Sequence, residues 1–445
     1  MSQVNEHRLV GYSAGMPVLA RLVSAPRIAR DRRSLLSRLA MVVFATLVLF
    51  STFNGAARYF LETSGLGLVV YVPAMLLFVS VLVLLFTQLK RRRMPRKDIG
   101  LWALLLASFI VGLVYVGNAS QTAFGLYVLL PFIFGFCYAN LLQARLAFIK
   151  RLMLLAWIFS IIGLALDYFT EVPWRGFGYQ IGKFQVEGNR DWTTFGIRRL
   201  SGFSRASFEL ASILLMSALF TMFHLHSRAM RCVLWLVTGF AIFLTTSKGV
   251  LLAMIVLSLV YGIRRAGMRK LIGWLVIVAV LAVVVLPLTA GLYSGSDLGL
   301  GLEDDFLLQS MGARFAQMWP DAFEHAHEVG NPLWGAGLGS IGVPLTYFSD
   351  RFQNSADNIF VYLYCLIGVF SLPLMFYVAV IAKRFVAASR YQGSDDFLVL
   401  QALLGCLIYG VTTNVVESSA LGLVFGFCLG AMLLIRSSHG VSHNE

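Results

Sequence analysis

Long apolar runs recur along almost the whole chain, and they restrict its fold more than any other feature. Of its 445 residues, 58% are hydrophobic and only 13% are charged, and the mean hydropathy is +0.77. Soluble domains carry about 25% charged residues, so a soluble globule of this composition could not cover its surface with polar groups. Several runs exceed the roughly 18 residues typical of a membrane span, and they are continuous rather than alternating, which excludes a β-barrel. The sequence therefore predicts an all-α polytopic membrane protein.

These runs predict about twelve transmembrane helices. The run at residues 232–263 is divided into two short spans, because one long helix would carry the basic residues after it to the wrong side of the membrane. Each half has about 15 residues, which is shorter than the hydrocarbon core, so Lys248 at the turn would lie below the outer surface. The predicted spans are residues 39–55, 66–89, 101–118, 126–142, 152–168, 208–225, 232–246, 249–263, 271–290, 358–382, 397–416 and 420–435.

The distribution of charge orients the predicted spans. Most of the 36 lysines and arginines, including the run Lys90–Lys97, lie in alternate loops with few acidic residues beside them. Because such loops stay on the cytoplasmic side, both termini are predicted to be cytoplasmic. The expected parts are a basic tail at 1–38, a single transmembrane domain at 39–435 and a tail at 436–445. The net charge of +14 is then an orientation signal with affinity for anionic membrane lipid, and no nucleic-acid partner is expected.

Two predicted outer loops, at residues 169–207 and 291–356, are far longer than the others. Loops of this length are uncommon unless they are functional or disordered. Both are rich in aromatic residues and glycine with arginines between them, which argues against disorder. The second loop contains an amphipathic helical pattern whose polar stripe includes Arg314. We expect this helix to lie along the outer face of the membrane, where the two loops would cap a functional site.

Three arginines lie where the first long loop enters the next span, on the side of the membrane where basic residues are rare. They are Arg198, Arg199 and Arg205. The planar guanidinium group suits phosphate and carboxylate, which favours an anion-binding site. The alternative is a set of interfacial side chains, with Arg205 paired to Glu209 one helical turn later.

Further polar residues could complete such a site, although each also has a structural interpretation. Lys248 is either an interfacial lysine on a tight turn or a cation in a cavity, and Arg314 is either a solvated charge or a ligand for the same anion. Asp357 precedes Asn358 at the start of a predicted span, where an aspartate can cap the helix. It could instead be a carboxylate in an arginine-rich cavity that accepts a proton or holds a sugar hydroxyl.

The sequence offers little support for a metal or nucleotide site. His325 and His327 are two residues apart, so they point to different faces of a helix. The segment Asn331–Ser340 contains close-approach glycines but lacks the pattern of a nucleotide-binding loop. The five cysteines all lie inside apolar runs and show no metal-ligand spacing. We expect no metal and no cofactor.

Three of these segments, in this order, resemble motifs of the O-antigen ligase/polymerase superfamily. Arg199–Gly202 matches an R-x-x-G stretch that precedes a mid-chain span, and residues 245–249 (TTSKG) resemble a T-x-S-R/K-G hairpin. The third segment is a long outer loop with an arginine, an N-P-x-x-G-x-G turn and a polar-Asn helix start, here Arg314, Asn331–Gly337 and Asp357-Asn358.

The resemblance covers roughly residues 190–380 and implies a metal-independent glycosyltransferase of the bacterial inner membrane. Such proteins take a glycan from a polyprenyl diphosphate and pass it to a glycan acceptor at the outer, periplasmic face. Cations at the outer leaflet would bind the diphosphate and stabilise it as it leaves. The predicted catalytic residues are Arg199, Arg314 and Asp357, and the predicted substrate-binding residues are Arg198, Arg205, Lys248 and Asn358.

One departure from the family pattern separates two activities. Ligases that load glycan onto the lipid A core or onto protein usually carry a histidine where this chain has Asp357, which favours a polymerase. A polymerase would extend an O-antigen or exopolysaccharide on undecaprenyl diphosphate, and a chain-length regulator or export complex is a conceivable partner. The non-enzyme alternative is a transporter of lipid-linked glycan or polysaccharide, although no internal repeat is apparent.

Overall fold

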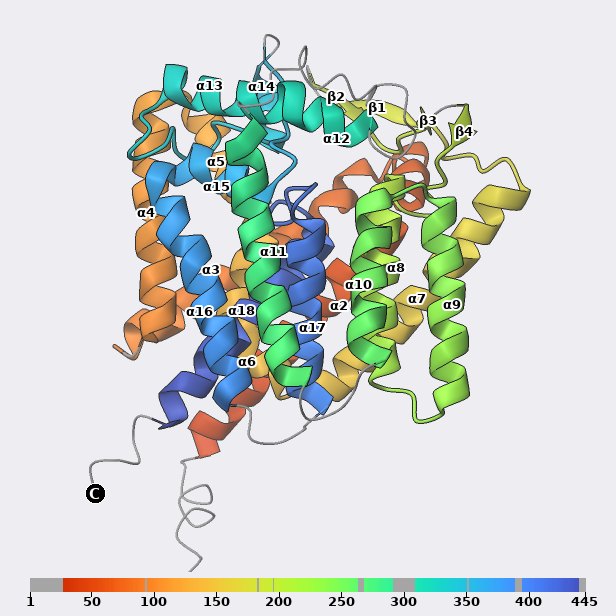
Figure 1. Cartoon of the computed structure of the whole chain (residues 1–445), viewed down its shortest axis with the longest axis horizontal. Coiled ribbons are helices and arrows are strands. Elements are labelled where there is room, and N and C mark those ends of the chain that lie inside the picture. Colours follow the sequence, from red (N-terminus) through yellow and green to blue (C-terminus); the bar gives the residue numbers. More distant parts are fainter. Residues whose placement is uncertain are drawn as a thin grey trace, which may run out of the picture.

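The computed structural model of the chain is a helical bundle with loops and short helices gathered at one end (Figure 1). It describes residues 27–92, 94–181, 184–194, 196–262, 268–290, 309–349, 352–388 and 394–439. The first half of the bundle contains α2 (Arg27–Thr63), a 3₁₀ turn (Gly67–Tyr71), α3 (Val72–Lys90), α4 (Arg96–Tyr115), α5 (Ala119–Val128), α6 (Leu130–Gln143) and α7 (Leu146–Phe169). The second half contains α8 (Ser207–Met222), α9 (Arg228–Leu244), α10 (Lys248–Gly262), α11 (Met268–Ala290), α15 (Ile359–Ile367), α16 (Ser371–Ala388), α17 (Ser394–Tyr409) and α18 (Ser419–His439).

Every apolar run that predicts a span overlaps a helix or a pair of helices, but the predicted number of spans is not confirmed. By length and composition, six helices of the described chain can cross a membrane, or seven if α5 and α6, which meet at a 43° bend, form one span. The apolar segments of α8, α10 and α18, at Ser207–Met222, Lys248–Val260 and Ser419–Leu434, are shorter than these spans. Figure 1 shows these shorter helices standing beside the long ones, so they belong to the same bundle.

Residues 232–263 form two helices, as predicted, and not one. Helix α9 ends at Leu244 and α10 begins at Lys248, and Thr246 in the turn between them has a φ of 56°. This left-handed backbone conformation, uncommon for a residue other than glycine, breaks the helix. The two helices pack against each other, and the Trp235 indole donates a hydrogen bond to Ser258 Oγ at 2.6 Å.

Glycines allow two helices at the centre of the bundle to pack with their backbones in contact. A Cβ atom at Gly135 of α6 would overlap the Leu423 carbonyl oxygen of α18, and one at Gly426 would overlap the Phe132 carbonyl oxygen. Small residues serve this purpose in membranes, where helix association depends on close van der Waals packing. The pair forms a rigid centre around which the other helices are arranged.

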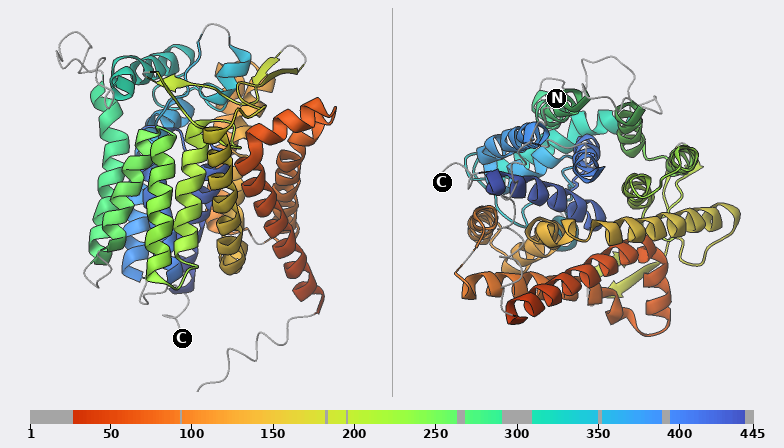
Figure 2. Two further views of the ribbon diagram at one scale, coloured as in Figure 1. Left: turned by 90° about the vertical axis from the view of Figure 1, so that its right-hand side faces the viewer. Right: turned by 90° about the horizontal axis from the view of Figure 1, so that it is seen from below.

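The described parts of both long loops lie at one end of the bundle, and the start of α2 and the end of α18 lie at the other end (Figures 1 and 2). The first loop forms two antiparallel hairpins, β1 (Gly178–Ile181) with β2 (Phe184–Glu187) and β3 (Thr193–Thr194) with β4 (Ile197–Arg198). The second loop forms α12 (Gln309–Ala313), a π-helical turn (Arg314–Met318), α13 (Trp319–Val329) and α14 (Val343–Phe348). Residues 1–26, 291–308 and 440–445 of the predicted tails and cap lie outside the described chain.

The helix predicted in the second loop has the expected amphipathic character. Trp319 and Ala322 are fully buried against the bundle, whereas Asp321 and Glu324 are exposed. The helix contains a π-helical turn that begins at Arg314. Such turns insert one extra residue and occur frequently at functional sites. The turn alters the register of the helix at the arginine of the predicted site.

Candidate functional site

Arg314 and Asp357 form an ion pair at the loop-covered end of the bundle. Arg314 Nη2 lies 2.8 Å from Asp357 Oδ2, and the two side chains are 16% and 23% exposed. Ser355 donates its hydroxyl to the other carboxylate oxygen of Asp357 at 2.6 Å, and Arg314 Nη1 donates to the Ser310 carbonyl at 2.6 Å. The carboxylate and the guanidinium are therefore held in place while each keeps some contact with solvent.

The backbone at Asp357 is in an unfavourable conformation. Ala356 and Asp357 have φ angles of 64° and 39°, in the left-handed region that favours glycine. Asn354 supports this turn, since its side chain accepts from the Ala356 amide at 2.8 Å and donates to the Met318 carbonyl at 2.7 Å. Such strain costs on the order of 1–3 kcal/mol per residue and is concentrated at functional sites. The strained turn supports a functional role for the Asp357 carboxylate.

Asn358, and not Asp357, caps helix α15. The Asn358 side-chain oxygen accepts from the Phe360 and Val361 amides at 2.7 and 3.1 Å, and its side-chain nitrogen donates to the Val411 carbonyl at 3.1 Å. Asn358 is also 0% exposed. Its carboxamide is thus occupied by backbone partners on both sides. The prediction that Asn358 binds the substrate finds no support in this geometry.

Arg199 approaches the same ion pair from the first long loop. Burial lowers the pKa of Arg199, and the positive charge of nearby Arg314 adds to this effect. The Arg199 guanidinium also lies 5.8 Å from the centre of the Trp192 ring. An arginine remains charged even when buried, so Arg199 adds a second positive charge close to Arg314, whose own charge is paired with one carboxylate. This arrangement favours an anionic ligand.

Arg198 has different partners from its neighbour. It pairs with Asp167 at the end of α7, at 3.3 Å, and Arg175 pairs with the same carboxylate at 3.1 Å. Asp167 also accepts hydrogen bonds from the backbone amides of Ser201 and Gly202, at 2.9 and 3.0 Å. These contacts hold the R-x-x-G stretch against α7. The structure therefore places Arg198 in an internal ion-pair cluster and not beside Asp357.

The remaining predicted binding residues lie at two further places. Arg205 donates its Nε to the Glu187 carbonyl at 2.9 Å, which ties it to β2 of the same loop and not to Glu209. Lys248 is half-buried at the first position of α10, in the turn that follows Thr246. The next residue, Gly249, packs against Tyr409 at the end of α17. The end of the TTSKG turn thus contacts the segment after α17, whose Gly410 and Val411 carbonyls bond to the two residues that follow Asp357.

Two residues of this region escaped the sequence analysis. Tyr409 lies among Arg199, Arg314 and Asp357, and Glu417 lies in the loop between α17 and α18. Glu417 carried a detectable signal, because an acidic residue beside two apolar runs is costly and usually functional. A tyrosine at the end of a span carried none, since membrane-interface tyrosines are common.

Glu417 is a partly buried acid that is held by a backbone hydrogen bond. Its Oε2 accepts from the Val343 amide at 3.1 Å, and the side chains of Tyr362 and Asn414 lie nearby. Its Oε1 has no hydrogen-bond partner among the described residues. Burial raises the pKa of Glu417 to about 8, although the hydrogen bond from Val343 and the nearby polar side chains act in the opposite direction. The carboxyl group is therefore mostly protonated at neutral pH, and it connects the segment before α18 to α14 as a neutral group.

We expect the folded protein to lose stability as the pH rises from about 4.5 to about 8, the unfolded and folded pKa values of Glu417. The stabilisation from the bound proton is greatest below the lower value and is lost above the higher one, because the unfolded chain releases the proton first. Glu417→Gln keeps a neutral group of similar shape and removes the titration. Between pH 5 and pH 9, the thermal midpoint of the wild type should fall further than that of the variant. Equal falls would contradict this assignment.

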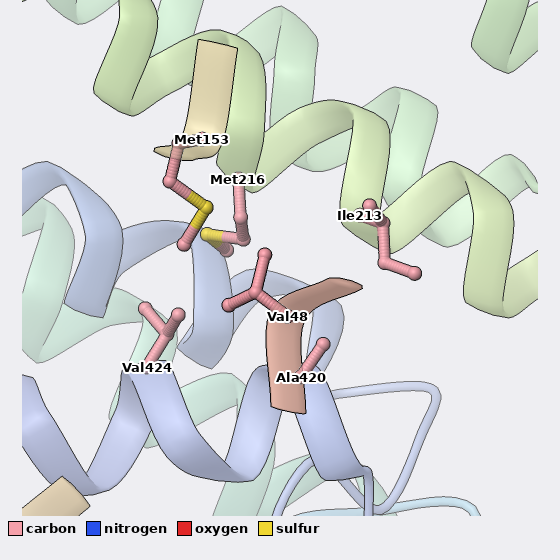
Figure 3. Close-up of a pocket in the computed structure, with 6 residues that line it drawn as sticks. All are labelled: Val48, Met153, Ile213, Met216, Ala420 and Val424. Carbon is pink, nitrogen blue, oxygen red and sulfur yellow. The ribbon is translucent and has the colours of Figure 1, made fainter. Parts of the chain in front are cut away.

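A small pocket lies deeper in the bundle, between α2, α7, α8 and α18 (Figure 3). Its lining has apolar side chains only, so it offers no partner for an anion or a sugar hydroxyl. The lining residues are Val48, Met153, Ile213, Met216, Ala420 and Val424. Within the described ranges, no group of three or more His, Cys, Asp and Glu could hold a metal ion. The ion pair at the loop-covered end is therefore the better candidate site.

Comparison with known families agrees with this choice of site. A family model described as O-antigen ligase matches residues 232–376, a region that includes the TTSKG turn, Arg314 and Asp357 but neither Arg199 nor Tyr409. No curated protein matches the chain. Members of the matched family are membrane glycosyltransferase-like enzymes, and the match gives no support to the transporter alternative. Together with the apolar helices, it indicates a multi-pass protein of the inner membrane. Residues 232–376 thus carry an O-antigen ligase domain, which confirms the resemblance of this chain to the O-antigen ligase/polymerase superfamily.

Proposed function

We propose that the protein is a polymerase of a bacterial surface polysaccharide, such as an O-antigen or an exopolysaccharide. It transfers a glycan from undecaprenyl diphosphate, or a related polyprenyl diphosphate, to a lipid-linked repeat unit at the outer face of the inner membrane. The main support is the Arg314–Asp357 ion pair at one end of an apolar bundle, with Arg199 near Arg314. Two guanidinium groups suit a diphosphate, and a carboxylate suits a sugar hydroxyl.

Each part of the transfer has a candidate residue. The acceptor hydroxyl oxygen forms a bond to the anomeric carbon of the donor glycan, and the bond from that carbon to the diphosphate oxygen breaks. Asp357 takes the hydroxyl proton, while Arg199 and Arg314 stabilise the negative charge that gathers on the leaving diphosphate. Because these guanidinium groups supply the charge that a metal ion could otherwise supply, we propose that the reaction is metal-independent.

The orientation of the protein follows from the same proposal. The two long loops, at 169–207 and 291–356, form a cap at the periplasmic end of the single transmembrane domain, and both terminal tails are cytoplasmic. Lys248 adds positive charge where the lipid-linked donor enters from the bilayer. Anionic lipid contacts the basic cytoplasmic surface, and a chain-length regulator or export complex acts on the same polymer.

The second candidate function is an O-antigen ligase, which passes finished glycan to a lipid or protein acceptor. The description of the matched family favours it. Asp357 favours the polymerase, because ligases of the resembled family usually carry a histidine at this position. Both activities require a bound diphosphate, so the arginines do not separate them.

Deletion of the gene separates the two activities. If the protein is a polymerase, single repeat units should accumulate on carrier lipid and long polymer should disappear, and both effects should be reversed by the wild-type gene. Loss of a ligase would leave long polymer on carrier lipid and none on the final acceptor. The lipid-linked glycans can be extracted and sized by electrophoresis, and the second pattern would replace the polymerase with the ligase. Activity of the purified protein in excess EDTA tests metal independence.

A further inference from the structure

Tyr409, the last residue of α17, connects two motifs of the candidate site that are far apart in the sequence. We propose that Tyr409 is a positioning residue, whose hydroxyl holds the TTSKG turn and the Asp357–Arg314 ion pair in a fixed relation during glycan transfer. This inference rests on the proposed function and deepens it, since it assigns a role within the same reaction. Tyr409 lies outside the residues matched by the family model.

The Tyr409 hydroxyl is buried among polar groups from both motifs. The residue is 5% exposed, and its hydroxyl lies beside the side chains of Ser247, in the TTSKG turn, and Thr413. Asp357 and Arg314 lie close enough for their charges to act on the same hydroxyl. A residue this enclosed has little surface for the glycan, so it acts through the groups that it contacts.

Backbone packing independently fixes Tyr409 against the TTSKG turn. A Cβ atom at Gly249 would lie 3.1 Å from the Tyr409 ring and would overlap the Thr412 hydroxyl. A larger residue at the last position of the turn would have to displace the Thr412 hydroxyl and press against the Tyr409 ring. The glycine of the T-x-S-K-G motif is explained by this contact.

The residues that follow Tyr409 hold the other motif. The Gly410 carbonyl accepts from the Ile359 amide at 3.0 Å, and the Val411 carbonyl accepts from the Asn358 side chain at 3.1 Å. Ile359 and Asn358 directly follow Asp357 in the chain. One short segment therefore holds the turn on one side and the start of α15, with its strained aspartate, on the other.

We expect Tyr409→Phe to lower the turnover number about 10- to 100-fold, because a displacement near 1 Å in a reacting group can cost this much. The KM for the lipid-linked donor should change little, since the arginines that bind it remain. Turnover can be measured with purified protein in lipid nanodiscs and a synthetic polyprenyl-diphosphate-linked repeat unit. Tyr138→Phe is the matched control. Tyr138 lies in α6, is 1% exposed and donates its hydroxyl to the carbonyl of Ser80 in α3 at 2.7 Å. The control should turn over at the wild-type rate.

A double variant separates positioning from general structural support. If Tyr409 acts through Asp357, Tyr409→Phe should cause little further loss in the Asp357→Asn protein. The same fold-loss in both backgrounds, or an unchanged rate for Tyr409→Phe alone, would overturn the inference. If Tyr409→Phe does not fold, Ser247→Ala removes a neighbour of the hydroxyl and should show the same dependence on Asp357. A folded wild-type protein without transfer activity would instead overturn the proposed function.

Discussion

Replacing Arg314 with alanine is expected to abolish long polymer while leaving the amount of protein in the membrane close to wild-type. The Arg314 guanidinium is held 2.8 Å from Asp357 and close to Arg199, where a leaving diphosphate would bind. Removing one preorganised group that stabilises developing charge costs about 10²–10³ in rate. Arg199→Ala should have an effect of similar size. Polymer length can be read from a gel of surface polysaccharide, and protein abundance from an immunoblot of the same membranes.

Lysine variants and a neighbouring arginine provide the controls for this result. Arg314→Lys and Arg199→Lys should restore activity only in part, because an ammonium group lacks the planar fork that binds two phosphate oxygens. Arg198→Ala should behave differently, since Arg198 pairs with the buried Asp167. It should lower protein abundance and polymer together. Wild-type polymer in Arg314→Ala cells would exclude Arg314 from the reaction.

The apolar runs predicted where the helices lie, but not where each begins. Helix α4 begins at Arg96, before the predicted apolar span, and it includes Asp98, which is 1% exposed. Asp98 enters the helix because Lys97 pairs with it at 2.9 Å and the Gln88 side chain donates to it at 2.7 Å. Hydropathy cannot predict that Asp98 is buried, since its burial depends on the hydrogen bond from Gln88, a residue of the preceding helix. The number of membrane spans depends on where each helix begins and ends, and composition alone could not determine that number.

Charge pattern identified the arginines of the site but could not separate neighbours. Arg198 and Arg199 are adjacent in an extended segment, where successive side chains point to opposite sides. One therefore meets Asp167 and the other approaches Arg314. Asp357 and Asn358 are equally good helix caps by residue type. The left-handed backbone at Asp357 decides between them, and that conformation depends on tertiary contacts.

Asp357→Asn is expected to lower the rate of transfer about 10²- to 10⁴-fold, the range that a general base contributes. Asparagine keeps the size of the side chain, adopts left-handed backbone conformations readily and can still accept a hydrogen bond from Arg314. The cap of α15 is untouched, because Asn358 supplies it. The variant should therefore fold and reach the membrane, while polymer in the deletion strain stays short or absent.

The adjacent residue is the matched control for this substitution. Asn358→Ala removes the cap of α15, at a cost of about 0.5–2 kcal/mol, and also the hydrogen bond to Val411. It should lower the thermal midpoint and the abundance of the protein, and it should lower the turnover of each folded molecule far less than Asp357→Asn does. Opposite outcomes, with a fast Asp357→Asn and a slow but stable Asn358→Ala, would transfer the chemical role to Asn358. If both variants turn over normally, Asp357 serves only to hold the Arg314 guanidinium, and the proton must leave the acceptor without a protein base.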